Sequence, residues 1–144
     1  MKGKVALITG SATGLGKMTA LSLARQGCSI VINYVNSKNE AEALSREIES
    51  FGVKSIVVKA NIADESELYS LVDQTERELG TVDILVNNAG PFIRERRLFS
   101  EYSRDEIVHM VNGNLTGVML LDHRVLPAMR EKRWGRIIHF GFGH

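Results

Sequence analysis

The segment TGSATGLG, residues 9–16, has the residue types and spacing of a backbone loop that binds a phosphate. Its glycines allow a sharp turn and let the backbone approach an anion without an intervening Cβ. A helix that starts near Gly14 would add free N–H groups and a partial positive charge. The segment therefore predicts a site for the pyrophosphate of a dinucleotide. The residues of this predicted site are Gly10, Ser11, Thr13, Gly14, Leu15 and Gly16.

Two other interpretations of the glycine segment are a tight turn that binds nothing and a Walker phosphate loop. The Walker loop is excluded because Lys17 follows the last glycine, but no Ser or Thr follows that lysine. An apolar run precedes the segment and a helical pattern follows it, and this context favours a dinucleotide turn over an inert one.

The segment INYVNSKN, residues 32–39, bears on the choice between NAD and NADP. In dinucleotide-binding folds an acidic residue at this strand end usually holds the ribose 2′-hydroxyl of NAD, but Asn33 and Tyr34 stand there. The missing carboxylate removes a repulsion against a 2′-phosphate, and Asn33, Ser37 and Lys38 can donate to one. The pattern favours NADP over NAD, although Lys38 taken by itself is better explained as an exposed lysine at a helix start.

Five short apolar runs supply the strands that must position these segments. They are rich in β-branched residues, and their continuous hydrophobicity is typical of strands buried on both faces. Helical patterns lie between them, which predicts an α/β fold, a Rossmann-like doubly wound parallel sheet in one domain over residues 1–144. The runs are residues 5–9, 29–33, 55–60, 83–87 and 136–140.

Periodicity also predicts which helix faces are buried. Two faces are expected at Ala41, Leu44, Ile48 and Phe51 and at Leu68, Leu71, Val72, Thr75 and Leu79. Asp64 and Glu67 have the spacing of a capping box at the start of the second of these helices. A long helix is expected over residues 104–132, kinked or shortened at Pro127. Its apolar stripe would be Ile107, Val111, Leu115, Val118, Val125 and Met129.

Composition excludes several classes of protein. The formal net charge of +1 argues against a nucleic-acid-binding surface, and no apolar run approaches the length of a membrane helix. Cys28 is the only cysteine, so no intrachain disulfide forms, and a buried thiol in a cytoplasmic protein is the expectation. The histidines lack the spacing of metal ligands, so no metal site is predicted.

Several short motifs, taken in order, resemble the short-chain dehydrogenase/reductase family. Besides the glycine segment they are NI (61–62), NNAG (87–90), NLTG (114–117) and GRII (135–138). Within the family the chain is most similar to the 3-oxoacyl-[acyl-carrier-protein] reductases. The resemblance implies a strand order of 3-2-1-4-5 and a reductase that transfers hydride from NADPH to a carbonyl, for example that of a 3-oxoacyl thioester.

The resemblance also implies roles for individual residues. Asn61 and Ile62 would flank the adenine ring, while Asn88, Ala89 and Gly90 would hold the sheet end open around the cofactor ribose. Asn114 would be catalytic, bending its helix and holding a water in a proton relay; a core asparagine that ties down backbone is the alternative. Relatives pair through the long helix, so a homodimer or homotetramer through residues 104–132 is expected.

The family's catalytic serine, and the Tyr-x-x-x-Lys on the helix after it, are not found behind the fifth apolar run. Phe142 takes the serine position, and His144 is the one nearby side chain that could replace the lost hydroxyl. We expect the chain to be the N-terminal part of a longer protein, incomplete at its C-terminal strands and helices. Alone, it should bind NADPH weakly or not at all and reduce no carbonyl. A non-catalytic dinucleotide-binding or interaction protein on the same scaffold is the alternative.

Overall fold

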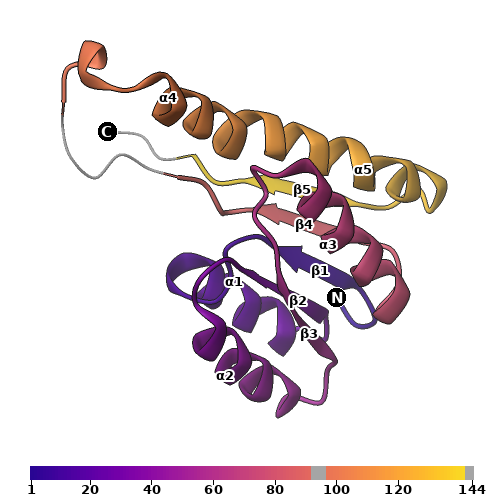
Figure 1. Ribbon diagram of the computed structural model, residues 1–144. Helices are drawn as coiled ribbons and strands as arrows, with labels where there is room; N and C mark the ends of the chain where they lie inside the picture. The colour runs from indigo at the N-terminus through magenta and orange to yellow at the C-terminus, as the bar shows by residue number, and fades with distance from the viewer. Residues whose placement is uncertain (92–96, 142–144) are drawn as a thin grey trace.

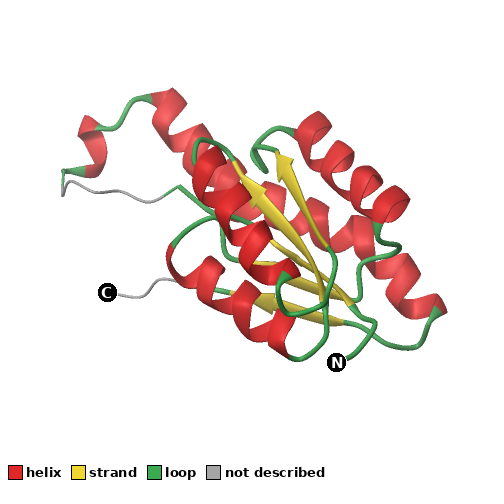
Figure 2. Cartoon of the chain, turned by 90° about the horizontal axis from the view of Figure 1, so that it is seen from below, coloured by secondary structure: helices red, strands yellow, loops and turns green. Residues whose placement is uncertain are grey.

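The computed structural model describes residues 1–91 and 97–141, which form a five-stranded parallel sheet with helices on both faces (Figures 1 and 2). The strand order is β3-β2-β1-β4-β5, so the predicted Rossmann-like topology is confirmed. Each strand lies within two residues of its predicted position. The strands are β1 (Val5–Ile8), β2 (Ser29–Tyr34), β3 (Ser55–Lys59), β4 (Ile84–Asn87) and β5 (Arg136–His139).

The helices divide between the two faces of the sheet, and each face has its own apolar core. The first two helices pack with Ile8, Ile30 and Ile32 on one face, and α3 and α5 pack with Leu7 and Leu85 on the other. Because β1 and β2 are covered on both sides, β1 is apolar throughout and the buried positions of β2 are apolar except for Asn33. The helices are α1 (Gly14–Arg25), α2 (Lys38–Glu49), α3 (Glu65–Glu78), α4 (Arg104–Val111) and α5 (Gly117–Glu131), with a 3-10 turn, η1 (Phe99–Glu101).

The predicted long helix is interrupted by a π-helical segment, η2 (Asn112–Thr116), between α4 and α5. The extra residue in this turn changes the phase of the helix, so Val111 and Leu115 of the predicted stripe are exposed and that part of the prediction is wrong. Pro127 does not end the helix, because α5 continues to Glu131. The stripe that is buried is Gly113, Gly117, Leu121, Val125 and Met129.

The last strand, β5, departs from the prediction that all strands are buried on both faces. It pairs with β4 and forms one edge of the sheet (Figure 1). Arg136, Ile138 and His139 are exposed, and Ile137 is half-buried against the core.

The start of α3 is capped as the sequence predicts, although only half of the capping box forms. The Asp64 carboxylate accepts a hydrogen bond from the Glu67 backbone N–H at 3.0 Å. The Glu67 carboxylate does not return to residue 64; it accepts from the backbone N–H of Asn61 at 2.7 Å. The second bond thus fixes the end of the segment that follows β3.

We expect Asp64→Ala to lower the thermal unfolding midpoint at pH 7. The Ser66 hydroxyl and the Glu67 backbone N–H hold the Asp64 pKa below its ordinary value of 3.8. A depressed carboxyl pKa stabilises the fold above about pH 4, and this stabilisation is lost as pH falls through the folded-state value. Circular dichroism melts should therefore show a midpoint difference from wild type that shrinks by pH 3. Asp64→Asn, an uncharged cap, is the control and should show little pH dependence; a constant Asp64→Ala difference contradicts the prediction.

Cys28 is fully buried beneath the N-terminus, as predicted for a structural thiol. Burial raises its pKa, so the thiolate form is disfavoured.

Of the helices in the described residues, none combines the length and hydropathy needed to span a bilayer.

Candidate functional site

A groove of about 330 Å³ lies where the carboxyl ends of β1 to β4 meet the α4 and η2 segments. In open α/β sheets this is where ligands bind. The groove joins the glycine turn, the end of β2, the segment after β3 and the segment after β4, all of which the sequence predicted to meet. Its lining residues are Gly10, Asn33, Val35, Asn36, Ala60, Asn61, Ile62, Ala89, Gly90, Pro91, His109 and Gly113.

The N-terminus of α1 is open to an anion. The Thr13 side chain does not cap the helix, no acidic residue lies in its first turn, and its first backbone bond runs from the Lys17 N–H to the Thr13 carbonyl. Gly14 has a φ of +56°, and a Cβ there would meet only open space. Thr13, Gly14 and Leu15 are exposed. These uncapped N–H groups and the space above Gly14 fit the pyrophosphate of a dinucleotide.

Gly16 is required by packing within the protein and does not face the groove. A Cβ on Gly16 would lie 2.5 Å from the carbonyl oxygen of Gly10 and 2.6 Å from Asn88 Nδ2. Gly10 has a φ of +62°, which favours glycine, and its own Cβ would lie 3.0 Å from the Ala89 side chain. The glycines therefore differ in role: Gly10 and Gly16 allow the turn to close, and Gly14 leaves the helix end accessible.

Asn33 lies in the floor of the groove, but its amide is engaged within the protein. Its Oδ1 accepts from the Gly10 N–H at 3.0 Å, and its Nδ2 donates to the carbonyls of Ala60 at 2.9 Å and Val58 at 3.4 Å. The predicted donation from Asn33 to a phosphate is therefore wrong for this arrangement. The asparagine instead joins the glycine turn to the end of β3.

Ser11 is likewise unavailable to a ligand, which corrects a second prediction. Its side chain is fully buried, and its Oγ accepts from the Asn33 backbone N–H at 3.1 Å. The two backbones pair as well, through the Ser11 N–H and the Asn33 carbonyl at 3.0 Å. Ser11 therefore holds the turn against β2.

The groove end beside β2 is formed by Val35 and Asn36 together with Asn33. Tyr34 is half-buried against the core, and Ser37, at the start of α2, is half-buried; neither is among the lining residues of the groove, and their contact with a ligand stays a prediction. The Lys38 ammonium lies 3.7 Å from the Glu42 carboxylate, which agrees with the surface interpretation of this lysine. No carboxylate lines this end among the described residues.

Asn61 and Ile62 line the groove together, as the resemblance implied. Ile62 is 5% exposed and packs into the core below. Asn61 Oδ1 accepts from the Ala63 N–H at 3.0 Å, which shapes the turn into α3. Its Nδ2 has no hydrogen bond within the described part of the chain. The pair thus presents an amide N–H and an aliphatic surface at this end of the groove.

Thr9, which sequence reasoning did not single out, connects β1 with the NNAG segment. Its Oγ1 accepts from the backbone N–H groups of Asn88 at 3.0 Å and Ala89 at 2.9 Å. In return, Asn88 Nδ2 donates to the carbonyls of Thr9 and Gly10 at 3.0 and 3.1 Å. The sequence feature that could have indicated this contact is the threonine directly before the first glycine of the turn. These bonds confirm that the asparagine amide satisfies backbone groups of the neighbouring strand end.

Asn114 lies in the π-helical segment, which confirms the predicted local distortion of the helix. Its side chain is exposed, not on a buried face, and Nδ2 donates to the Pro91 carbonyl at 2.8 Å. A Cβ on Gly90 would collide with Asn114 Oδ1, and one on Gly113 would collide with the Pro91 ring. Close contact between η2 and the segment after β4 therefore needs both glycines. The relay role of Asn114 stays a prediction.

A polar chain that the sequence did not predict connects β4, α5 and β5. Asn87 Nδ2 donates to Asp122 Oδ1 at 2.9 Å, and His139 Nε2 lies 3.1 Å from Asp122 Oδ2. Asn87 and His139 are register neighbours, so both side chains face α5. Within the described ranges, the opposite atom, Asn87 Oδ1, is buried without a hydrogen-bond partner. The amide therefore fixes β4 to α5 from one side.

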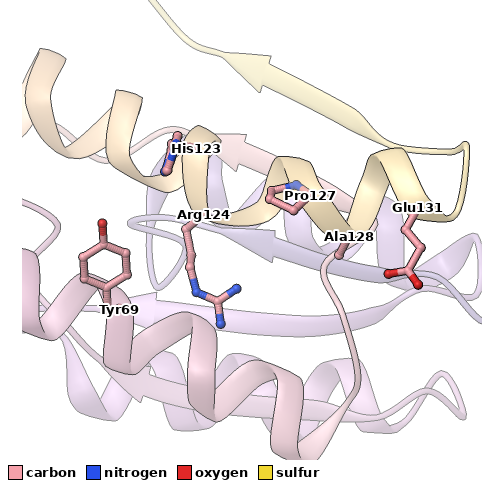
Figure 3. A pocket seen from close by; sticks show the side chains of 6 residues that line it. All are labelled: Tyr69, His123, Arg124, Pro127, Ala128 and Glu131. Carbon is pink, nitrogen blue, oxygen red and sulfur yellow. The ribbon is translucent and has the colours of Figure 1, made fainter.

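A second hollow, of about 460 Å³, lies between α3 and α5 and contains none of the predicted site residues (Figure 3). Arg124 reaches across it to Asp73 at 2.8 Å and Glu76 at 2.7 Å, and these carboxylates raise the pKa of Arg124. The guanidinium is thus committed to holding the two helices together. The hollow is lined by Tyr69, His123, Arg124, Pro127, Ala128 and Glu131.

Phe142 and His144, which the sequence placed at the catalytic serine position and beside it, lie outside the described residues. Among the described residues that line the groove, His109 and the side-chain amides are therefore the only side chains that could donate or accept a hydrogen bond during carbonyl chemistry. The arrangement can hold a nucleotide, and residues 140–144, which follow β5, contain no Tyr-x-x-x-Lys; the one pair with this spacing, Tyr34 and Lys38, stands at the end of β2.

Comparisons with known proteins agree with this architecture. A model of the short chain dehydrogenase family matches residues 4–141. The 3-oxoacyl-[acyl-carrier-protein] reductase FabG of Staphylococcus epidermidis is 38% identical over 136 residues, covering 94% of this chain and 55% of that protein. The chain thus spans about half the length of the curated relatives it matches.

Two solved structures share the fold over nearly the whole chain. A blue fluorescent protein from a metagenomic library, in complex with NADPH, has a TM-score of 0.86 and 35% identity, with 97% of this chain and 56% of that one covered. A short chain dehydrogenase from Burkholderia cenocepacia, in complex with NADP, has a TM-score of 0.85 and 32% identity, with the same coverage.

Proposed function

Because the chain belongs to the short chain dehydrogenase family, we propose that it forms the cofactor-binding part of an NADP-dependent oxidoreductase that reduces a carbonyl. The observation that carries the proposal is the open N-terminus of α1 above Gly14, beside a groove lined by Asn61 and Ile62. The bound nicotinamide would supply the hydride. The residues of this chain would hold the pyrophosphate and the adenosine.

The choice of NADP is supported by the end of β2, where Asn33, Val35 and Asn36 line the groove and no carboxylate is found among the described lining residues. Two structural relatives are complexes with NADPH and NADP. NAD remains the less favoured cofactor, because no carboxylate among the described lining residues at this end would accept a hydrogen bond from its free 2′-hydroxyl.

Because the residues that line the groove all lie between Gly10 and Gly113, we expect weak binding by this chain and not its absence. We predict that NADP raises the thermal unfolding midpoint of the chain more than NAD does at equal millimolar concentration. The reason is that a ligand stabilises the folded state according to its concentration relative to its dissociation constant. Differential scanning fluorimetry measures both shifts, with nicotinamide mononucleotide as the control that lacks the adenosine. Equal or greater stabilisation by NAD contradicts the choice of NADP, and no shift with either contradicts the proposed function.

A 3-oxoacyl thioester is the proposed substrate class, supported by the similarity to 3-oxoacyl-[acyl-carrier-protein] reductases. The second candidate function is dinucleotide binding without catalysis, and Phe142 at the serine position favours it. Reading the gene past the codon for His144 separates the two. A Tyr-x-x-x-Lys within about a dozen residues supports the reductase, because the family's chemistry depends on it.

We also propose that the protein pairs with copies of itself through the helical segment 104–132. Apolar side chains on this segment are left exposed, which is typical of a surface that another element covers. The exposed apolar residues of this segment are Val108, Val111, Leu115, Met119 and Leu126.

A cytoplasmic location is proposed from the single buried thiol, Cys28.

A further inference from the structure

His109, in the last turn of α4, separates two hollows at the carboxyl end of the sheet. On one side it lines the groove that contains Gly10 and Ile62. On the other it lines a polar hollow of about 380 Å³ that also contains Asp64 and Asp105. Asn61 is the other residue shared by both hollows. The imidazole and the Asn61 amide therefore stand together at one end of the cofactor groove.

The helix that carries His109 is fixed at both ends. At its start, the Ser103 hydroxyl accepts from the Glu106 N–H at 3.2 Å, and the Glu106 carboxylate accepts from the Ser103 N–H at 2.8 Å. At its end, Gly113 packs on the Pro91 ring, one turn beyond His109 on the same helix face. The position of the imidazole beside Asn61 is thus determined by the backbone on either side.

The chemistry of His109 differs from that of its neighbours in the groove. Among the described lining residues it is the only ionisable side chain and the only aromatic one. An imidazole offers a flat ring together with one nitrogen donor and one acceptor. Ile62 offers an aliphatic surface, and Asn61 offers an amide N–H. A flat heterocycle with both donors and acceptors on its edge is the ligand group that this combination suits.

We propose that His109 contacts the adenine ring of the dinucleotide and forms the wall of that subsite opposite Ile62. The inference rests on the proposed function, since it assumes that the groove holds the adenosine half of NADP. His109 acts here in binding, and it takes no part in hydride transfer. It was not predicted from the sequence, because the cofactor motifs lie on the strand ends and His109 lies on a helix five residues before Asn114.

The test measures dissociation constants for NADP, NAD and adenosine 2′,5′-bisphosphate with the full 144-residue chain. His109→Ala is expected to weaken all three by about tenfold, because the loss of one ring that stacks on a base has an effect of this order. His109→Phe keeps a flat ring and should stay within about threefold of wild type. His123→Ala, an exposed histidine on α5 outside the groove, is the matched control and should bind as wild type does.

A second readout is the imidazole signal of His109 in proton NMR, identified by its disappearance in His109→Ala. Adenosine 2′,5′-bisphosphate should shift this signal by ring current, whereas nicotinamide mononucleotide should not. Unchanged affinity in His109→Ala, or a loss confined to the ligands with a 2′-phosphate, overturns the adenine contact. If the wild-type chain binds none of the ligands, the proposed function fails first and the inference falls with it.

Discussion

Gly16→Ala is expected to destabilise the chain by about 3 kcal/mol and to abolish nucleotide binding. The added Cβ would lie 2.5 Å from the Gly10 carbonyl oxygen and 2.6 Å from Asn88 Nδ2. Both atoms are fixed, because Asn88 Nδ2 donates to the Thr9 and Gly10 carbonyls. Alanine normally favours a helix over glycine by up to about 1 kcal/mol, but overpacking of a rigid site costs roughly 1–3 kcal/mol and sometimes more. The clash therefore outweighs the gain in helix propensity.

Gly14→Ala is the matched control, two residues earlier in the same turn. Its Cβ meets open space, so the cost is limited to the φ of +56°, about 1–2 kcal/mol. It should fold and bind NADP more weakly, because the new methyl group occupies space above the helix end. Guanidinium unfolding followed by circular dichroism measures both stabilities. Equal losses in the two variants would show that the Gly16 contacts can relax and that the packing argument is wrong.

The strand ends could be predicted from the sequence because buried parallel strands have a simple pattern. Runs such as residues 5–9 and 83–87 are continuous in hydrophobicity, and the glycine turn after the first run has few alternatives. The meeting of residues 9–16, 61–62 and 87–90 at one groove then follows from the topology. The sheet and the elements of the candidate site could therefore be predicted from the sequence alone.

The orientation of single polar side chains could not be predicted from the sequence in the same way. Asn33 was expected to face a phosphate, but the parallel register of β1 and β2 brings it level with the glycine turn, where unpaired backbone groups compete for its amide. The predicted buried face of the long helix was partly wrong for a related reason. One extra residue in η2 rotates the positions before it relative to those after it, so Val111 and Leu115 face outward. Both depend on contacts between segments far apart in sequence.

His109 illustrates a third limit. A histidine in a helix of mixed composition carries no distinctive signal, and its relation to the groove appears only once α4 is placed across the ends of β1 and β3. The nearest sequence clue is its spacing of four residues before Gly113, which must face the Pro91 ring. Such a clue becomes informative only after that contact is known.

Asn33→Asp is expected to destabilise the chain by about 3–5 kcal/mol at pH 7, the typical cost of an uncompensated buried charge. Asn33 is 1% exposed, and its Nδ2 donates to the carbonyl oxygens of Ala60 and Val58. A carboxylate keeps the acceptor for the Gly10 N–H, but it places a negative charge against two carbonyl oxygens and offers them no proton. Asn36→Asp makes the same change at an exposed position of the groove and should leave stability within about 0.5 kcal/mol of wild type.

The pH dependence of Asn33→Asp separates the buried charge from a general packing defect. Burial and the facing carbonyls raise the pKa of the new carboxyl above its unfolded value of about 3.9. The folded state then binds the proton more tightly, so the loss relative to wild type grows as pH rises above about 4 and levels off above the folded-state pKa. Urea unfolding of both variants and wild type at pH 5 and pH 7 measures this difference. A loss that is equal at the two pH values would mean that the carboxylate finds solvent or a cation, and that Asn33 is not the closed link between the glycine turn and β3.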